Sequence, residues 1–398
     1  MTCPDTEAGD TIMTRTRTRF ARVDIVHVSS AHPWTDNRVH LREAASTVAG
    51  GYRTALVAVG NGLPAPETGV ICHLLRKRGR LSRVTLGSIE AVVSALRFRP
   101  RAVHLHDPEL VWSVPVFRRL GVVVIWDAHE DLPDQVLDKH YLSPFQSRVF
   151  SAAARLVVRL ARSSDAILTA TERIAARFPD EKTSVVHNFP RPRAHDGRAP
   201  AVVHRPRRVG YIGALGTYRG SEVLPTAIAD PRFPDGWTLH VAGSFVPVST
   251  RRPYESLHEA GAVVLHGQVG PDEARDILLD TRVGIVTFLP NAAHLEALPT
   301  KMFEYLAAGI PVIASDFPLW RQLLGPHDCA TFVDPHCGAA IAEAVRFYDE
   351  NPDVLARQSR NALRAAREVF SWTSEESVLL EAYRRVGLVP TTHQTPRS

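Results

Sequence analysis

The chain is poor in cysteine and lysine and has no long apolar run. Its four cysteines form no Cys-x-x-Cys pair and no zinc spacing, which favours buried or idle thiols in a reducing compartment. No apolar segment approaches the roughly 20 residues of a membrane-spanning helix, and no signal-peptide stretch precedes residue 23. We therefore expect a cytoplasmic protein with reduced thiols, at Cys3, Cys72, Cys329 and Cys337.

The remaining composition is that of a globular protein. Hydrophobic residues make up 44% of the 398 positions and charged residues 22%, which excludes a largely disordered chain. The length predicts two domains. The net charge of +5 permits phosphate-bearing ligands or an acidic membrane surface without selecting either, and no nucleic-acid partner is expected.

Short β-rich runs alternate with helical patterns, which is typical of parallel βαβ units. We expect a flexible tail at 1–20, a first Rossmann-like domain at 21–188, a proline- and arginine-rich linker at 189–207, and a second Rossmann-like domain at 208–365. A helix at 366–388 is expected to return to the first domain. The expected strands are 23–28, 55–59, 102–105, 122–126 and 166–169, then 208–212, 238–242, 262–265, 283–286, 311–314 and 331–333.

The most informative segment is 294–315, with the sequence HLEALPTKMFEYLAAGIPVIAS. Pro299 can open a helix and Gly309 can end it. The free N–H groups at the start of that helix favour an anion. Lys301 in the first turn is unfavourable for the helix alone by about 0.3–1 kcal/mol, and a bound phosphate would remove that conflict. Glu304, one turn further on, can accept two ribose hydroxyls.

With Glu296 eight positions before Glu304, this segment resembles the retaining GT-B glycosyltransferases of family 4, glycosyl transferases group 1. The resemblance implies an α/β GT-B fold, in which two Rossmann-like domains face each other across a cleft that binds a nucleoside-diphosphate sugar. It places Glu304 on the ribose and Glu296 by the sugar and diphosphate, beside Pro299, Thr300 and Lys301. The alternative is an ordinary amphipathic helix with two surface glutamates, which the surrounding frame disfavours.

Two further segments of the second half fit the same family. The loop at 210–220 follows a strand, so Gly213 and Gly216 allow backbone N–H groups to approach a diphosphate. It is not G-x-G-x-x-G, which disfavours an NAD site. In the family, a basic residue at the place of Arg219 neutralises the leaving diphosphate, although Ala214 stands where many members carry a second arginine. The alternative for Arg219 is a solvated loop residue.

The segment 264–273 resembles the family loop whose backbone contacts the base, here around Gly267 and Val269. The chain has no Asp-x-Asp motif, with which a divalent ion would hold the diphosphate. We therefore expect no metal and no cofactor, with the diphosphate held by arginine, lysine and helix N–H groups.

In the first half, the segment 31–44 resembles a family subgroup that begins with D-x-R-V. Asp36 and Arg38 are expected to face the cleft on the acceptor side, although Asp36 could equally be a helix N-cap. Asp107 and His129 each follow a predicted strand and are further acceptor-side candidates. The family places a histidine like His129 on a hydroxyl of the donor sugar.

His104 and His106 share one face of a strand, which could indicate a metal site. No third ligand has fitting spacing, so a packed or hydrogen-bonded role is favoured. Arginines on one flank of helix 147–162 favour a solvated basic face over an apolar core stripe. Weak peripheral contact with the inner face of a membrane is the alternative. The arginines are Arg148, Arg155, Arg159 and Arg162, beside Val149, Leu156 and Val157.

The catalytic candidates are Glu296, His129, Arg219 and Lys301. The expected partners are a nucleotide-sugar donor, with UDP favoured and GDP next, and a glycan, lipid-linked sugar or small natural product as acceptor. A nucleotide-sugar 2-epimerase of similar fold is the alternative among enzymes. A non-catalytic nucleotide-sugar-binding subunit is the alternative outside them.

Overall fold

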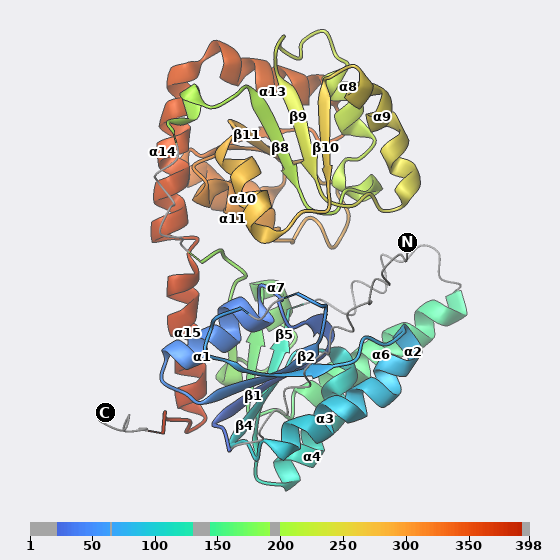
Figure 1. Ribbon diagram of the computed structural model, residues 1–398, viewed down its shortest axis with the longest axis vertical. Coiled ribbons are helices and arrows are strands. Elements are labelled where there is room, and N and C mark those ends of the chain that lie inside the picture. Colours follow the sequence, from blue (N-terminus) through green and yellow to red (C-terminus); the bar gives the residue numbers. More distant parts are fainter. Residues whose placement is uncertain (1–21, 64–65, 130–143, 192–199, 392–398) are drawn as a thin grey trace, which may run out of the picture. The chain divides into compact units, whose positions relative to one another are not determined.

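The computed structural model describes residues 22–63, 66–129, 144–191 and 200–391. They form two β-sheets of parallel strands, each with helices packed on it (Figure 1). The first sheet has seven strands in the order β3-β2-β1-β4-β5-β6-β7. Their bounds are β1 Ile25–Pro33, β2 Thr54–Val59, β3 Ile71–Leu75, β4 Ala102–Leu105, β5 Val123–Ala128, β6 Ala166–Thr169 and β7 Thr183–Val185.

The second sheet has six strands in the order β10-β9-β8-β11-β12-β13. The order reverses direction between β8 and β11, and loops that leave two such strands open a crevice at their carboxyl ends. The bounds are β8 Arg208–Ile212, β9 Thr238–Ala242, β10 Val263–Gly267, β11 Val283–Val286, β12 Val312–Ser315 and β13 Ala330–Val333. The α/β fold class and the two Rossmann-like sheets are as predicted.

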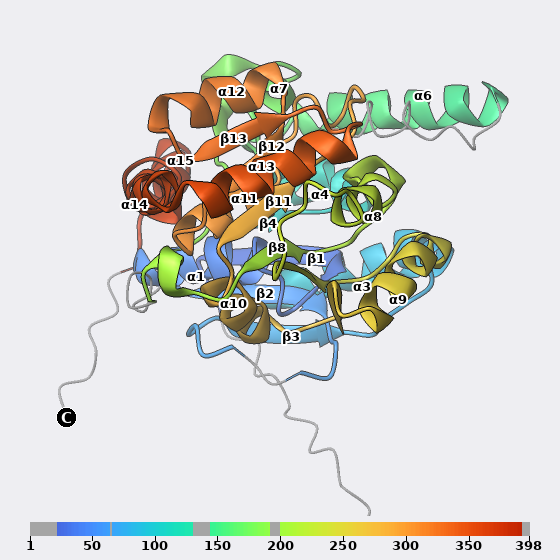
Figure 2. The same cartoon turned by 90° about the horizontal axis from the view of Figure 1, so that it is seen from above.

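Helices cover both faces of the second sheet (Figure 2). One apolar layer packs β11 and β12 against α11 (Thr300–Ala307), α12 (Pro318–Leu324) and α14 (Pro352–Glu368). The other packs β8 and β9 against α8 (Val223–Ile228) and α13 (Gly338–Glu350). The remaining α-helices are α1 Ala45–Ala49, α2 Arg80–Ser82, α3 Ser88–Arg97, α4 Val114–Arg119, α6 Pro144–Ala161, α7 Glu172–Ala175, α9 Arg252–Glu259, α10 Pro271–Leu279 and α15 Trp372–Arg385.

Helix α15 packs against β6 and β7 of the first sheet (Figure 1). The segment 200–207, which precedes β8, is held to the second sheet by one arginine. Arg205 is buried, and its guanidinium donates hydrogen bonds to the carbonyls of Pro200, Thr281 and Ala308. It therefore satisfies a carbonyl at the C-terminal end of α11 that the helix itself leaves without an intrahelical donor.

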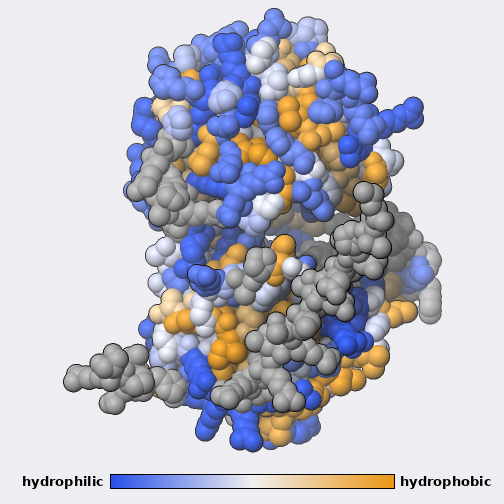
Figure 3. All heavy atoms as spheres, in the orientation of Figure 1, coloured by the Kyte–Doolittle hydropathy of each residue, from blue (hydrophilic) through white to orange (hydrophobic). Residues whose placement is uncertain are grey.

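The apolar stripe expected on α6 is not a core stripe. Val149 is 50% exposed and Leu156 is 56% exposed, whereas Ala154 and Ala161 are the buried positions. Large apolar side chains are also exposed on α2 and on the turn η2 (Arg83–Gly87), among them Leu81 at 85%. Polar and apolar side chains are interspersed over the face drawn in Figure 3. No helix in the described parts of the chain is long and apolar enough to cross a bilayer.

The described cysteines are free thiols, as expected. Burial raises the pKa of Cys72 to about 11 and the pKa of Cys329 to about 12. Because the thiolate is the reactive form, the half-buried Cys72 and the buried Cys329 act as small apolar groups. Cys3 lies outside the described residues.

Candidate functional site

The loop that follows β8 is shaped by two glycines. Gly213 has φ +110°, a conformation that side chains other than glycine rarely adopt. A Cβ atom added at Gly216 would lie 2.4 Å from the carbonyl oxygen of Val246. The loop therefore requires glycine at both positions, and it places Arg219 in the short turn η6 (Thr217–Arg219) at the carboxyl end of the strand.

Lys301 enters the same region from α11, in the first turn of the helix. Its Nζ is buried and has no hydrogen-bond partner among the described residues. The nearest group is the ring of Tyr211, whose centroid lies 3.6 Å from Nζ. Burial lowers the pKa of Lys301 well below its usual value, and the nearby charge of Arg219 lowers it further, while Glu304 acts in the opposite direction.

The two cations share one aromatic neighbour. The Arg219 Cζ lies 5.9 Å from the centroid of Phe288, and the Lys301 Nζ lies 5.7 Å from it. Phe288 follows β11 and is 5% exposed. Two like charges around a buried ring are costly unless an anion binds between them, so the arrangement has the chemistry of a phosphate site.

The start of α11 adds backbone donors to this site. Pro299 is its N-cap residue, and no side chain caps the helix. The preceding loop is fixed by Trp320, whose indole N–H donates to the carbonyl of Ala297 at 2.8 Å. Glu304 lies one turn inside the helix and is half-buried, whereas Glu296 lies in the loop with 45% of its side chain exposed. The predicted donor residues Gly213, Gly216, Arg219, Pro299, Thr300, Lys301 and Glu304 thus gather at the ends of β8 and β11.

The predicted base loop lies at the end of β10. Gly267 is exposed with φ +72°, and its carbonyl accepts a hydrogen bond from Gly243. Val269 is half-buried. Behind this loop, the Nδ1 of His240 lies 3.0 Å from the Nε2 of His266, and burial lowers the pKa of His240 to about 4. The assignment of Gly267 and Val269 to the nucleotide base stays a prediction.

In the first half of the chain, Asp36 holds the turn that leads into the helical segment η1 (Val39–Ala44). One carboxylate oxygen accepts hydrogen bonds from the backbone N–H groups of Arg38 and Val39, both at 2.8 Å. The other lies 3.3 Å from the Nδ1 of His32. Burial alone would raise the pKa of Asp36, but the bonds from His32 and the backbone lower it to about 2.

Asp107 was predicted to be on the acceptor side, but it instead holds the carboxyl-terminal half of β1. It is buried, and it accepts hydrogen bonds from the hydroxyl of Ser29 at 2.8 Å and the backbone of Ser30 at 2.5 Å. His32 bridges the two acidic candidates, since its Nε2 lies 3.5 Å from Asp107. His32 is half-buried and is the side chain of this group best placed to meet a ligand.

The prediction for Arg38 needs correction. Its guanidinium was expected to face the acceptor, but Arg38 is 5% exposed and its Nε lies 2.9 Å from Glu43. A buried arginine that neutralises a buried glutamate has a structural role.

His129 is positioned by a residue that the sequence interpretation missed. Its Nδ1 lies 3.0 Å from the carboxylate of Asp127, which is buried at the end of β5. A carboxylate that accepts the Nδ1–H of a neutral histidine leaves the lone pair at Nε2, the arrangement suited to accept a hydroxyl proton. Asp127 lies in β5 and His129 directly follows the strand, two positions further on, a spacing visible in the sequence.

Tyr211 and Phe288 were also missed. They are buried aromatic residues of a kind that fills every α/β core, and no sequence signal distinguishes the two that contact Lys301. Their role becomes visible only because β8 and β11 are neighbours in the sheet.

Two family models match the chain. Residues 206–350 match "Glycosyl transferases group 1", and residues 37–189 match "Glycosyl transferase 4-like domain". A D-inositol 3-phosphate glycosyltransferase of Streptomyces avermitilis is 25% identical over 261 residues, which cover 60% of this chain. The match spans about half of that relative, 53% of its length.

Solved structures share the fold over nearly the whole chain. Anabaena HepE in complex with UDP and glucose has a TM-score of 0.70 and 13% identity, covering 92% of this chain and 100% of HepE. Sucrose-phosphate synthase from Thermosynechococcus elongatus has a TM-score of 0.69 and 15% identity, covering 92% and 99%. At such low identity these structures establish the two-domain fold.

Proposed function

Because the chain belongs to the GT-B glycosyltransferases, we propose that it transfers a sugar from a nucleoside-diphosphate sugar to a hydroxyl, with retention of configuration. The observation that carries this proposal is the buried Lys301 ammonium, which lacks a hydrogen-bond partner in the described structure and interacts electrostatically with Arg219 at the start of α11. A diphosphate would supply the anion that this arrangement requires.

A UDP-sugar is the first candidate donor, with a GDP-sugar next, and HepE in its complexes with UDP supports that order. The acceptor is a glycan, a lipid-linked sugar or a natural product. In this proposal the protein works on the cytoplasmic side and needs no metal for the diphosphate. The exposed basic flank of α6 would give weak contact with a membrane surface where the acceptor is lipid-linked.

In the proposed reaction the bond between sugar C1 and the phosphate oxygen loosens, and negative charge grows on the departing diphosphate. Arg219, Lys301 and the N–H groups at Thr300 stabilise that charge, and each donor contributes about 2–4 kcal/mol. The acceptor hydroxyl attacks from the face of the leaving group, and the donor phosphate takes its proton. No covalent intermediate on the protein is needed.

Other residues hold the substrates. Glu304 accepts the ribose hydroxyls, and Glu296 lies by the sugar. His129, oriented by Asp127, accepts a hydroxyl of the sugar through Nε2. On the acceptor side, His32 and Asp36 replace the buried Arg38 as the candidates that meet the acceptor.

The first experiment is a thermal-shift panel with UDP, GDP, ADP, dTDP and NAD. A ligand at 100 times its dissociation constant adds about 2.7 kcal/mol to the free energy of unfolding. We expect one nucleoside diphosphate to raise the melting temperature of the wild type and of Glu259→Ala, a control on exposed α9, but not of Glu304→Ala. A shift with NAD alone, or with none of the five, would contradict a nucleotide-sugar donor.

Turnover distinguishes the alternatives. With the donor identified, product anomers followed by NMR test retention, and assays with and without added Mg²⁺ test metal independence. Free nucleotide with an epimerised sugar, released without an acceptor, would favour the 2-epimerase. Binding without turnover that is insensitive to Glu296→Ala would favour a non-catalytic subunit.

A further inference from the structure

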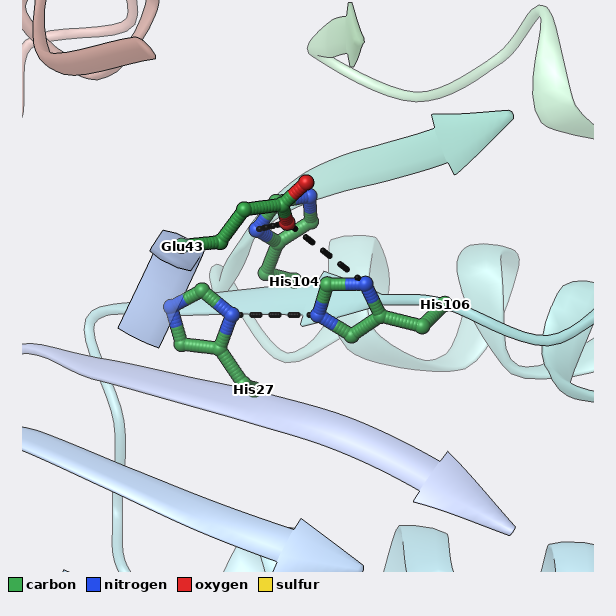
Figure 4. A group of neighbouring side chains, drawn as sticks. All are labelled: His27, Glu43, His104 and His106. Carbon is green, nitrogen blue, oxygen red and sulfur yellow. Dashed lines mark hydrogen bonds and ion pairs between the residues drawn. The ribbon is translucent and has the colours of Figure 1, made fainter. Parts of the chain in front are cut away.

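Three histidines and one glutamate lie together against one face of the first sheet (Figure 4). His27 comes from β1, His104 from β4, His106 directly follows β4, and Glu43 belongs to the helical turn η1 (Val39–Ala44). None is more than 1% exposed. One nitrogen or oxygen from each side chain lies within 4.8 Å of those of the other three. The histidine pair seen in the sequence therefore acquires two further candidate ligands through the fold.

The glutamate points one oxygen at two imidazoles. Its Oε2 lies 3.7 Å from the Nδ1 of His104 and 3.7 Å from the Nδ1 of His106. These separations are too long for hydrogen bonds. Ligand atoms around a tetrahedral Zn²⁺, each at about 2.0–2.1 Å, are about 3.3–3.4 Å apart. The two separations between Glu43 and the histidines are therefore close to those of atoms that share one ion.

The backbone that carries Glu43 is unusual. The N–H of Glu43 bonds to the carbonyl of Arg38, five residues earlier, which makes this a π-helical turn. Such turns are rare and are frequent at functional sites. The other oxygen of Glu43 lies 2.9 Å from the Nε of Arg38, a contact of the kind that orients a metal-binding carboxylate from outside.

We propose that His27, Glu43, His104 and His106 form a Zn²⁺ site. Imidazole nitrogens with a single carboxylate oxygen suit Zn²⁺, whereas Mg²⁺ and Ca²⁺ need mostly oxygen ligands. Four protein ligands in a buried site leave no open position, so the ion is structural. It ties η1 to β1 and β4 and is separate from diphosphate binding by Lys301 and Arg219.

The competing arrangement is a hydrogen-bonded chain of histidines without metal. The Nδ1 of His27 lies 3.0 Å from the Nε2 of His106, a normal hydrogen-bond distance. With that chain alone, the protein would hold no stoichiometric metal, and chelation would leave its stability unchanged.

The test is metal analysis of untagged protein purified without chelator, followed by chelation and reloading with Zn²⁺ alone. We expect about one Zn²⁺ per chain and a fall of at least about 5 °C in the melting temperature on chelation, reversed by Zn²⁺. Replacement by Co²⁺ should give the strong visible absorption of a four-coordinate ion.

Variants locate the site. His104→Gln and Glu43→Gln should weaken Zn²⁺ binding at least tenfold in competition with a chromophoric chelator. His240→Gln, which removes a buried histidine from the second sheet, should bind like the wild type. A wild type that is purified without metal and whose melting temperature does not change on adding Zn²⁺ would overturn the proposal. This measurement does not depend on the folding of any variant. Equal Zn²⁺ affinity in folded His104→Gln would overturn it as well.

Discussion

At the residue scale, Asp36 should make stability depend on pH. Its pKa is about 2 in the folded protein, against the ordinary aspartate pKa of 3.8 in the unfolded chain. A lowered folded pKa contributes stability above the unfolded value and loses it as pH falls through the folded value. Asp36→Asn should therefore lower the free energy of unfolding by about 1–2 kcal/mol at pH 7, with the difference fading between about pH 5 and pH 2.

Urea unfolding of both proteins across that range measures the effect. The asparagine Oδ1 can accept the same two backbone hydrogen bonds, so the substitution removes the charge and keeps these bonds. In a His32→Gln background the pH-dependent difference should shrink, because the hydrogen bond and the charge of His32 lower the pKa of Asp36 more than the backbone N–H groups do. A difference in the free energy of unfolding that does not vary with pH would show that the charge of Asp36 does not contribute to stability.

Lys301 should lower the free energy of unfolding of the ligand-free protein and increase its affinity for a nucleoside diphosphate. Its ammonium is buried without a hydrogen-bond partner among the described residues, so Lys301→Met should raise the free energy of unfolding without ligand by about 1–2 kcal/mol. The same change should weaken binding of the nucleoside diphosphate at least tenfold, or about 1.4 kcal/mol. Denaturant unfolding and calorimetric titration measure the two effects.

Lys77→Met provides the matched control, because Lys77 is exposed. It should change neither stability nor binding by a measurable amount. A Lys301→Met protein that is less stable and binds nucleotide normally would contradict the phosphate role, since the lysine would then serve packing.

At the element scale, docking of α15 on the first sheet should depend on His187. This residue follows β7, and its ring lies 3.3 Å from Glu375 of α15 and 3.2 Å from Glu172 of α7. Burial opposes protonation, but the two carboxylates raise the pKa of His187. The stability from this contact is present below the ordinary histidine pKa of 6.5 and is lost as pH rises through the raised pKa of the folded state.

Glu375→Gln should therefore be less stable than the wild type at pH 6, and the gap should narrow as the pH rises above the folded pKa of His187. Thermal unfolding at a series of pH values checks this. Glu376→Gln, also on α15 and paired with Arg191 on the outside of the helix, is the control and should give a small, nearly constant difference. A gap that widens with pH would refute the assignment.

Central strands were predictable in both sheets, whereas the edge strands of the first sheet were not. The expected ranges 102–105 and 166–169 match β4 and β6, and five strands of the second sheet match within one residue, because buried parallel strands are continuous apolar runs. The edge strands β3 and β7 were missed. The first is largely half-exposed and the second has three residues, so neither has an apolar run.

The candidate site divides in the same way. The placement of Lys301 and Glu304 on one helix could be predicted because helix start signals and spacing fix it, whereas their roles stay predictions. His32, Tyr211 and Phe288 were missed because their roles depend on neighbours brought together by the order of strands. The cluster around Glu43 was missed because it joins β1, η1 and β4, which are far apart in the sequence.

At the scale of the whole molecule, the proposed nucleotide and the proposed zinc ion contact different sheets, so each should stabilise its own surroundings. Amides open locally, and a ligand slows exchange most where opening breaks the ligand's contacts. UDP at 100 times its dissociation constant should slow exchange up to about 100-fold in 210–220, 264–269 and 296–304. Chelation of zinc should instead speed exchange in β1, β4 and η1.

Hydrogen exchange read by mass spectrometry on the full chain resolves these segments. Since UDP lacks the sugar, the peptide that contains Asp127 and His129 should respond only when the intact nucleotide sugar replaces it. Glu304→Ala should lose the UDP response and keep the response to chelation, whereas His104→Gln should do the reverse. If UDP protected β1 and β4 as strongly as the loop after β8, the donor would have to contact the first sheet through its nucleotide, and the assignment of Lys301 and Arg219 would be wrong.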